Sequence, residues 1–312
     1  MIGRLPNRTR RRVDVAAFIR SLCAALAASA SLLLGAGCAA AGGGVDVRPS
    51  QGCGASPPAT VPSRVEVDGR SRDLIVAAPD SYDHRKPHDL VVAFHGLTNS
   101  NADVRRYYNL ERHARRPTIF VYPSGLPAGE GRRSWSDPGD PAAQLRDYAL
   151  FDAIAAQFGR AYCIDRGRIF AVGHSLGAWF VNSLGCARGR ELRAIGSVAG
   201  GISPSECTGP VAAVLVHNPN DRLVDFSHGE EVRDHLLARN GHAGPSRPAA
   251  EKTDLNCVRY GGSADANPVL WCPHAHDRTR DGRYYPHQWP AETGALIMTF
   301  FAALPAQAAP SE

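Results

Sequence analysis

Short apolar runs recur along the chain and alternate with segments whose apolar residues repeat every three or four positions. The runs are nearly continuous and are bounded by turn residues, a pattern typical of strands that are buried on both faces of a parallel sheet. Five such runs predict strands at 90–94, 118–122, 168–172, 194–198 and 211–216.

Helical spacing is present between several of these predicted strands. Leu150, Ile154 and Phe158 are four residues apart, as on one face of a helix. Further helices are predicted at 178–184, at 230–239 and, close to the end of the chain, at 291–304.

A hairpin is predicted ahead of the first buried strand. Segments 64–67 and 73–76 flank Asp68-Gly69, a dipeptide suited to a hairpin turn. An antiparallel leading hairpin followed by alternating strands and helices indicates an α/β fold with a mostly parallel central sheet and helices on both faces. We expect one such domain over 63–305 and a flexible tail over 306–312.

The first 37 residues have the organisation of a secretory signal peptide. They combine a basic start, an apolar run over 21–36 and small residues around Gly37-Cys38, and the run is short for a membrane anchor. Cys38 is a lipidation candidate, because it would begin the mature chain. The sequence leaves open whether the protein is freely secreted or lipid-anchored to the cell envelope.

The next segment, 38–62, is rich in Gly, Ala and Pro and shows no period. Such a composition predicts a tether, with Cys53 as the residue that would join its end to the domain. After residue 40, no stretch is long and apolar enough to span a bilayer.

Most of the excess positive charge belongs to the leader. Residues 1–37 hold six of the 35 basic residues and one of the 30 acidic residues, so the rest of the chain is formally neutral. The basic balance therefore does not indicate a nucleic-acid partner. We expect a monomer that binds no nucleic acid.

Six cysteines remain once Cys23 and Cys38 are set aside. An even number in an exported chain fits up to three disulfides, and the sequence leaves their pairing open. A zinc site would favour close pairs such as C-x-x-C, which are missing, so no metal is expected. The disulfide candidates are Cys53, Cys163, Cys186, Cys207, Cys257 and Cys272.

The motif with the clearest chemistry is Gly173-His174-Ser175-Leu176-Gly177, between the predicted strand 168–172 and the predicted helix 178–184. In this context G-x-S-x-G is typical of a nucleophile elbow, a tight turn that presents the serine hydroxyl above the sheet. Ser175 is the expected nucleophile. The amide of Leu176, at a helix N-terminus, is an expected oxyanion donor.

A second oxyanion donor is expected after the strand 90–94. The strand runs into His95-Gly96-Leu97, and in folds of this type the corresponding loop supplies a backbone N–H. The amide of Leu97 is the candidate. The other interpretation is that His95-Gly96 only ends the strand.

The acid and the base are expected later in the chain. Asp221 follows the strand 211–216 on a turn, and Asp225 is its competitor as a helix cap. His287 precedes the last helix, where a catalytic histidine is expected, and His274 and His276 are its rivals. Such a triad needs neither a metal nor a cofactor.

Four segments of the chain together resemble a known family. Residues 95–97, 173–177, 220–224 and 286–290 are similar to those of secreted polyhydroxybutyrate depolymerase and feruloyl esterase-type proteins, in carbohydrate esterase family one. The resemblance covers roughly residues 50 to 303 and implies an α/β-hydrolase fold. Segments 257–262 and 268–272 resemble the family's paired-cysteine hairpin, which implies a Cys257–Cys272 disulfide and favours His287 over its rivals and Asp221 over Asp225.

The resemblance implies an exported serine esterase that hydrolyses feruloyl esters of plant cell-wall polysaccharide. A polyester depolymerase, an acetyl xylan esterase, a peptidase and a non-catalytic glycan-binding lipoprotein are the alternatives. Two departures from the family pattern, at Asn218-Pro219 and Arg146-Asp147, are expected near the substrate rim. The expected substrate-binding side chains are His95, His174, Trp135 and Trp289, although Trp135 would serve equally well as a packed residue.

Overall fold

The computed structural model describes residues 47–136, 140–203, 206–250, 253–262 and 265–307, all within one compact unit. The predicted signal peptide, Cys38 and the first part of the predicted tether lie outside these residues, as does the end of the predicted tail. None of the described helices is both long and apolar enough to cross a membrane.

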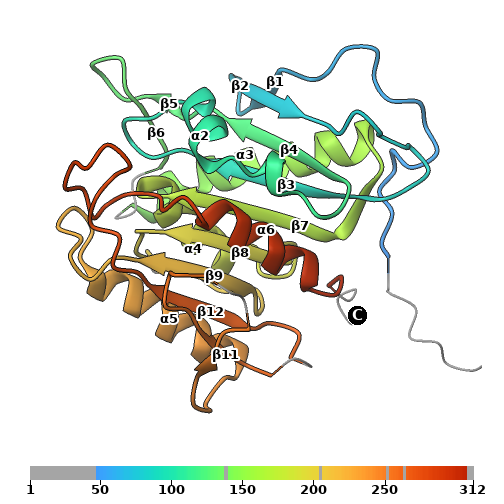
Figure 1. The fold of residues 1–312 in the computed structure, drawn as a ribbon. Coiled ribbons are helices and arrows are strands. Elements are labelled where there is room, and N and C mark those ends of the chain that lie inside the picture. Colours follow the sequence, from blue (N-terminus) through green and yellow to red (C-terminus); the bar gives the residue numbers. More distant parts are fainter. Residues whose placement is uncertain (1–46, 137–139, 204–205, 251–252, 263–264, 308–312) are drawn as a thin grey trace, which may run out of the picture. The chain divides into compact units, whose positions relative to one another are not determined.

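A ten-stranded sheet forms the centre of the described part of the chain (Figure 1). Its strand order is β1-β2-β4-β3-β7-β8-β9-β12-β11-β10. The six middle strands are parallel. They are β4 (Thr118–Pro123), β3 (His88–Phe94), β7 (Ile164–His174), β8 (Ala194–Val198), β9 (Ala212–His217) and β12 (Val269–Pro273).

Antiparallel strands complete both edges of the sheet. The predicted hairpin forms one edge as β1 (Arg64–Val67) and β2 (Arg70–Ala77). The other edge consists of β11 (Val258–Tyr260) and the short β10 (Arg247–Pro248). The predicted fold class is confirmed: a mostly parallel sheet with an antiparallel leading hairpin.

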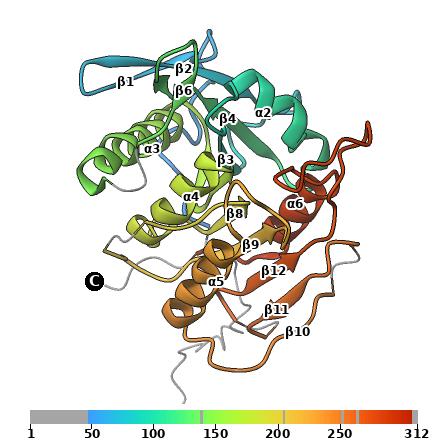
Figure 2. The ribbon, with the colours of Figure 1, turned by 90° about the vertical axis from the view of Figure 1, so that its left-hand side faces the viewer.

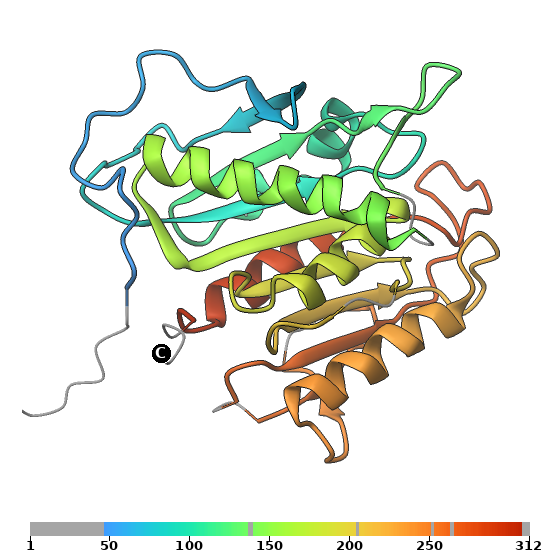
Figure 3. The same cartoon turned by 180° about the vertical axis from the view of Figure 1, so that it is seen from behind.

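Helices cover both faces of the sheet. On one face lie α3 (Pro141–Ala161), α4 (Leu176–Ala187) and α5 (Phe226–Asn240), in front in Figure 3. The other face carries α2 (Asn101–Tyr108), the 3-10 turn η1 (Glu111–His113) and α6 (Thr293–Ala303). Each face has its own apolar core, and every residue of β3 and β4 is buried, as expected of strands covered on both faces. Two further short strands, β5 (Leu126–Pro127) and β6 (Arg133–Ser134), pair beside this sheet.

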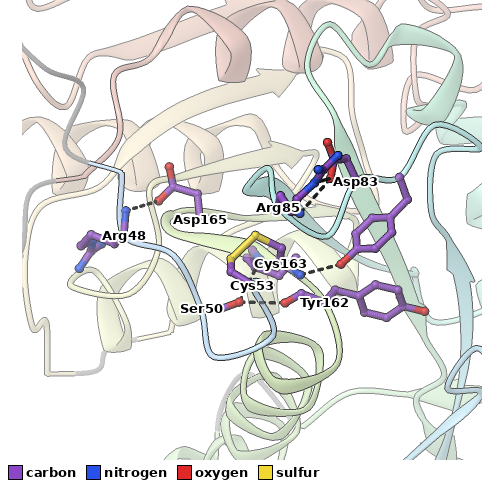
Figure 4. Close-up of a disulfide and its surroundings, with 10 residues drawn as sticks. Arg48, Ser50, Cys53, Asp83, Arg85, Tyr162, Cys163 and Asp165 are labelled. Atoms are coloured by element: carbon purple, nitrogen blue, oxygen red, sulfur yellow. Dashed lines mark hydrogen bonds and ion pairs between the residues drawn. A yellow bond between two sulfur atoms is a disulfide. The ribbon is translucent and has the colours of Figure 1, made fainter. Parts of the chain in front are cut away.

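The segment predicted as a tether is bonded to the domain from Arg48 onward (Figure 4). Ser50 Oγ donates to Tyr162 O at 2.8 Å and accepts from Ile164 N at 2.9 Å, and Cys53 forms a disulfide with Cys163. The packed part therefore begins well before residue 63, because these bonds satisfy backbone groups at the start of β7.

Two more disulfides join Cys186 to Cys207 and Cys257 to Cys272. The second pairing is the one that the family resemblance implies. It links the segment before β11 to β12, so it fixes the edge of the sheet from which the chain continues to His287.

Candidate active site

The candidate catalytic residues gather at the carboxyl edge of the parallel strands. They lie on the loops that follow β3, β7, β9 and β12, at the left of Figure 1 and toward the viewer in Figure 2. Ligand sites in open α/β sheets form at this edge, because the loops from neighbouring parallel strands meet there.

Ser175 stands at the turn between β7 and α4 in a backbone conformation that L-residues rarely adopt. Its φ of 56° and ψ of −124° place it in a strained region, and its N–H donates to Val198 O at 2.9 Å. A Cβ at Gly173 or Gly177 would collide with backbone atoms of the turn or of the loop after β3. Ser175 is partly exposed to solvent.

The loop after β3 lies against Ser175. A Cβ built on Gly96 would stand 3.5 Å from the Ser175 Cβ. Neither Leu97 N–H nor Leu176 N–H donates to a partner among the described residues. Both amides are therefore available to an oxyanion formed at Ser175.

His95 is fully buried and does not reach the substrate side, so the expectation that its side chain binds substrate is wrong. Its Nε2 accepts from Gly125 N at 2.9 Å, which leaves the proton on Nδ1 to donate to Gly96 O at 2.7 Å. Burial lowers the pKa of His95 to about 4, and the ring stays neutral as these two bonds require. These bonds hold the loop after β3, residues 95–97, which carries the predicted oxyanion donor Leu97 and which we call the oxyanion loop.

Trp135 is also an interior residue, with 2% of its surface exposed. Its Nε1 donates to His95 O at 2.5 Å, and its ring meets Phe94 edge-on at 5.1 Å. Of the two interpretations of Trp135, packing is the correct one, because Trp135 fills the space beneath the oxyanion loop.

Asp147 explains why Trp135 points inward. The carboxylate is fully buried, accepts from Arg72 Nη1 at 2.9 Å and bonds the backbone and hydroxyl of Ser136. The Arg146-Asp147 departure thus places its carboxylate in the interior rather than at the substrate rim, where we expected it.

Asp221 and His287 form the closest contact between candidate acid and base. His287 Nδ1 lies 2.6 Å from Asp221 Oδ2, while Asp221 Oδ1 accepts from Leu223 N at 2.9 Å and Val224 N at 3.1 Å. Burial alone would raise the pKa of Asp221. The nearby His217 ring, whose Nε2 lies 3.6 Å from Oδ2, and the hydrogen bonds from His287 and the Leu223 amide outweigh burial, so the pKa lies well below its usual value and the group is a carboxylate.

The rival residues lie elsewhere. Asp225 is exposed at the start of α5 and makes no side-chain cap. His274 is buried and accepts from His276 N at 3.2 Å, and His276 lies 3.5 Å from Asp254. Within the described part of the chain, neither histidine bonds Asp221.

Asn218 connects two loops. One is the loop between β9 and α5, which carries Asp221 and which we call the acid loop, and the other is the loop that carries His287. Asn218 is fully buried and donates from Nδ2 to Asp277 Oδ1 at 2.9 Å, while Asp277 O accepts from Tyr285 N at 2.7 Å. We expected the Asn218-Pro219 departure near the substrate rim, but the asparagine is a buried link between two catalytic loops.

His174 belongs to the elbow, and Trp289 belongs to the loop between β12 and α6 that carries His287, which we call the base loop. His174 is 6% exposed and its Nδ1 lies 3.1 Å from Tyr107 Oη. Trp289, partly buried, stacks on Tyr108 with ring centroids 3.9 Å apart. His174 packs among neighbouring aromatic rings, and substrate binding by His174 and by Trp289 stays a prediction.

Tyr107 and Tyr108 are functional candidates that the sequence patterns did not reveal, because α2 was not predicted. The sequence does hold a signal for this helix. Ser100 and Asp103 form a capping box, in which each side chain bonds the backbone of the other.

Two groups of described side chains have the ligand types and spacing to hold a metal ion. One is Cys186, Cys207 and His235, in which the two cysteines form a disulfide. The other is Asp254, His276 and Glu292, with both carboxylates exposed. Neither group includes Ser175, Asp221 or His287, and the chemistry of a serine nucleophile requires no metal.

No family model matches the chain. Its sequence is 32% identical over 254 residues to a probable feruloyl esterase C of Aspergillus flavus, covering 74% of this chain and 89% of that protein. It is also 32% identical over 244 residues to feruloyl esterase C of Emericella nidulans, covering 75% and 84%.

Solved structures share the fold at low sequence identity. An acetyl xylan esterase from Aspergillus awamori aligns with a TM-score of 0.52 at 12% identity, over 74% of this chain and 94% of that one. A Bacillus cereus carboxylesterase aligns with a TM-score of 0.50 at 14% identity, over 74% and 93%. The extent and identity of the sequence matches show that the chain belongs to the feruloyl esterase C family.

Proposed function

We propose that the protein is an exported serine esterase that hydrolyses feruloyl esters carried by plant cell-wall polysaccharide. The observation that carries the proposal is the 2.6 Å contact between His287 Nδ1 and Asp221 Oδ2, with the His287 ring centroid 5.0 Å from that of His174, the residue before Ser175 at the strained turn. The acyl group follows from the relatives, which are named as feruloyl esterases.

The residues divide the reaction into two steps. Ser175 Oγ attacks the ester carbonyl while His287 Nε2 takes the hydroxyl proton, and the amides of Leu97 and Leu176 donate to the oxyanion. The tetrahedral intermediate expels the sugar alcohol, which takes the proton from His287. Water then attacks the acyl-enzyme with the same base, and ferulic acid leaves as Ser175 regains its proton.

Asp221 stabilises the imidazolium that forms in each step. Its Oδ2 faces His287 Nδ1, so Nδ1 carries the proton in the resting enzyme and Nε2 is free to accept one. Two backbone amides hold the other carboxylate oxygen, which keeps the group charged and oriented.

Export is part of the proposal. The three disulfides in the described residues are typical of an oxidising compartment outside the cytosol. We propose that the protein acts as a monomer outside the cell and meets its polysaccharide substrate there.

The test compares the purified protein with its Ser175→Ala variant on methyl ferulate, 4-nitrophenyl acetate, a hydroxybutyrate oligoester and feruloylated arabinoxylan. We expect release of ferulate by the wild type and a loss of roughly 10⁶-fold in kcat for Ser175→Ala. Ser81→Ala, an exposed serine at the other end of the domain, is the matched control and should match the wild type.

Equal rates for the wild type and Ser175→Ala would end the assignment of Ser175. Turnover of acetyl or hydroxybutyryl esters without ferulate release would refute the proposed acyl group, while leaving the serine mechanism in place.

A further inference from the structure

The end of α2 contacts both the elbow and the base loop. Tyr107 Oη lies 3.1 Å from His174 Nδ1, and His174 directly precedes Ser175. The ring of Tyr108 is stacked on Trp289, at 3.9 Å and an interplanar angle of 13°, and Trp289 follows His287 by two residues. Tyr107 therefore contacts the residue before Ser175, and Tyr108 contacts a residue close to His287.

His174 is the residue of this group that lies closest to the base. Its ring centroid is 5.0 Å from that of His287, with the planes tilted by 33°. Its Nε2 is buried and has no hydrogen-bond partner among the described residues.

The partners of His174 indicate where its proton lies. If Tyr107 donates its hydroxyl proton to Nδ1, the neutral ring carries its own proton on Nε2, the buried nitrogen without a partner. The imidazole thus lies between the Tyr107 hydroxyl on α2 and the ring of His287.

His174 is suited to this place because it stays uncharged. Burial, and after it the charge of neighbouring His287, lower the pKa of His174 to about 3. A second cation 5.0 Å from His287 would oppose the proton transfer from Ser175, and a neutral imidazole does not.

Tyr107 also reaches the oxyanion loop. Its hydroxyl lies 3.4 Å from Asn99 Oδ1, and Asn99 N donates to Gly96 O at 3.2 Å. The same hydroxyl thus neighbours the loop that supplies the Leu97 amide, so the base and the oxyanion donor share one support.

We propose that His174 is a positioning residue for the general base: held by the Tyr107 hydroxyl, its imidazole fixes the loop that carries His287 beside Ser175. The inference rests on the proposed function, since it deepens the account of the same site. It assigns His174 no contact with substrate.

Tyr107→Phe is the mildest test, because it removes one oxygen and leaves the ring. We expect kcat on methyl ferulate to fall roughly 10- to 100-fold with KM within about twofold, since misplacement of a reacting group by a fraction of an ångström has effects of this size. Tyr82→Phe is the matched control: its hydroxyl accepts one hydrogen bond, from Cys163 N at 2.8 Å, away from the catalytic edge. It should keep the wild-type kcat.

Substitutions at His174 separate its two nitrogens. Gln places an amide nitrogen near the position of Nε2, whereas Asn reaches only the position of Nδ1. We expect His174→Gln to retain more of the wild-type kcat than His174→Asn, with similar melting temperatures for both.

A second measurement follows the rate at which a fluorophosphonate labels Ser175, which requires no natural substrate. A kcat for Tyr107→Phe within twofold of the wild type, or a raised KM at unchanged kcat, would overturn the proposal. If the wild type releases no ferulate, the proposed function fails, but the labelling rates still decide on positioning. Slower labelling of Tyr107→Phe supports it, and equal labelling refutes it.

Discussion

Replacement of Asp221 by Asn should convert His287 to the wrong tautomer. Two backbone amides, those of Leu223 and Val224, donate to Asp221 Oδ1 at 2.9 and 3.1 Å. An amide NH₂ at that position would face two donors, so the Asn must place its oxygen there. Its nitrogen then occupies the position of Oδ2 and donates to His287 Nδ1, which forces the imidazole proton onto Nε2.

With its proton on Nε2, His287 cannot accept one from Ser175. The corresponding change in a serine triad lowers kcat about 10⁴-fold, and a loss of this size corresponds to about 5.5 kcal/mol of transition-state stabilisation. We expect the same order here, because the two amides leave the Asn side chain no alternative orientation.

The assay measures kcat on methyl ferulate and 4-nitrophenyl acetate near neutral pH, with folding checked by thermal melting. Asp225→Asn is the matched control, since that carboxylate is exposed, makes no side-chain cap and should be replaceable without loss. An Asp221→Asn enzyme that keeps more than about a tenth of the wild-type kcat would refute the assigned orientation and the role of the carboxylate in setting the tautomer.

Three further predictions concern stability. The folded-state pKa of His95, about 4, lies below the unfolded value of 6.5, so its contribution is full above about pH 6.5 and is lost as the pH falls toward 4. His95→Gln, which keeps an acceptor for the buried amide, should flatten urea-unfolding stability over that range, and an unchanged pH dependence would contradict this. Removal of the Cys53–Cys163 disulfide, which spans 110 residues, should cost about 4–5 kcal/mol of unfolding free energy, and a cost below about 1 kcal/mol would contradict the loop-entropy reasoning. Gly177→Ala should abolish activity and lower the melting temperature, because its Cβ would lie 2.7 Å from His95 O, whereas Gly244→Ala, with open space around it, should behave as the wild type in the same melts.

The sequence predicted the parts of the fold whose signals are local. The five apolar runs all became strands of the parallel sheet, because a strand covered on both faces needs apolar residues at every position. The strand β12 was not predicted as a central strand. Its five residues end in Cys272-Pro273, and its parallel pairing with β9 depends on contacts far apart in the chain.

The site was less predictable where it depends on long-range burial. Ser175 could be found because its turn is encoded in five consecutive residues. The inward direction of His95 and of Trp135 could not be found in this way. His95 bonds Gly125, which is 30 positions away, and Ser136, the neighbour of Trp135, bonds Asp147, which is 11 positions away. The sequence therefore suggested substrate contacts for His95 and Trp135, whereas both side chains support the loop after β3 in the folded chain.

The distinction between buried supporting residues and exposed loop residues also bears on the choice of substrate. The two departures from the family pattern, at Asp147 and Asn218, are fully buried, so they act on substrate only through the loops that they hold. By contrast, Leu97, Leu223 and Tyr284 are 39%, 70% and 52% exposed, and each lies on a different catalytic loop: the oxyanion loop, the acid loop and the base loop. Because they are exposed, these three side chains are accessible to an ester in solvent. We therefore expect substitutions at these three positions to change the acyl preference of this protein, whereas interior changes alter the support of the site.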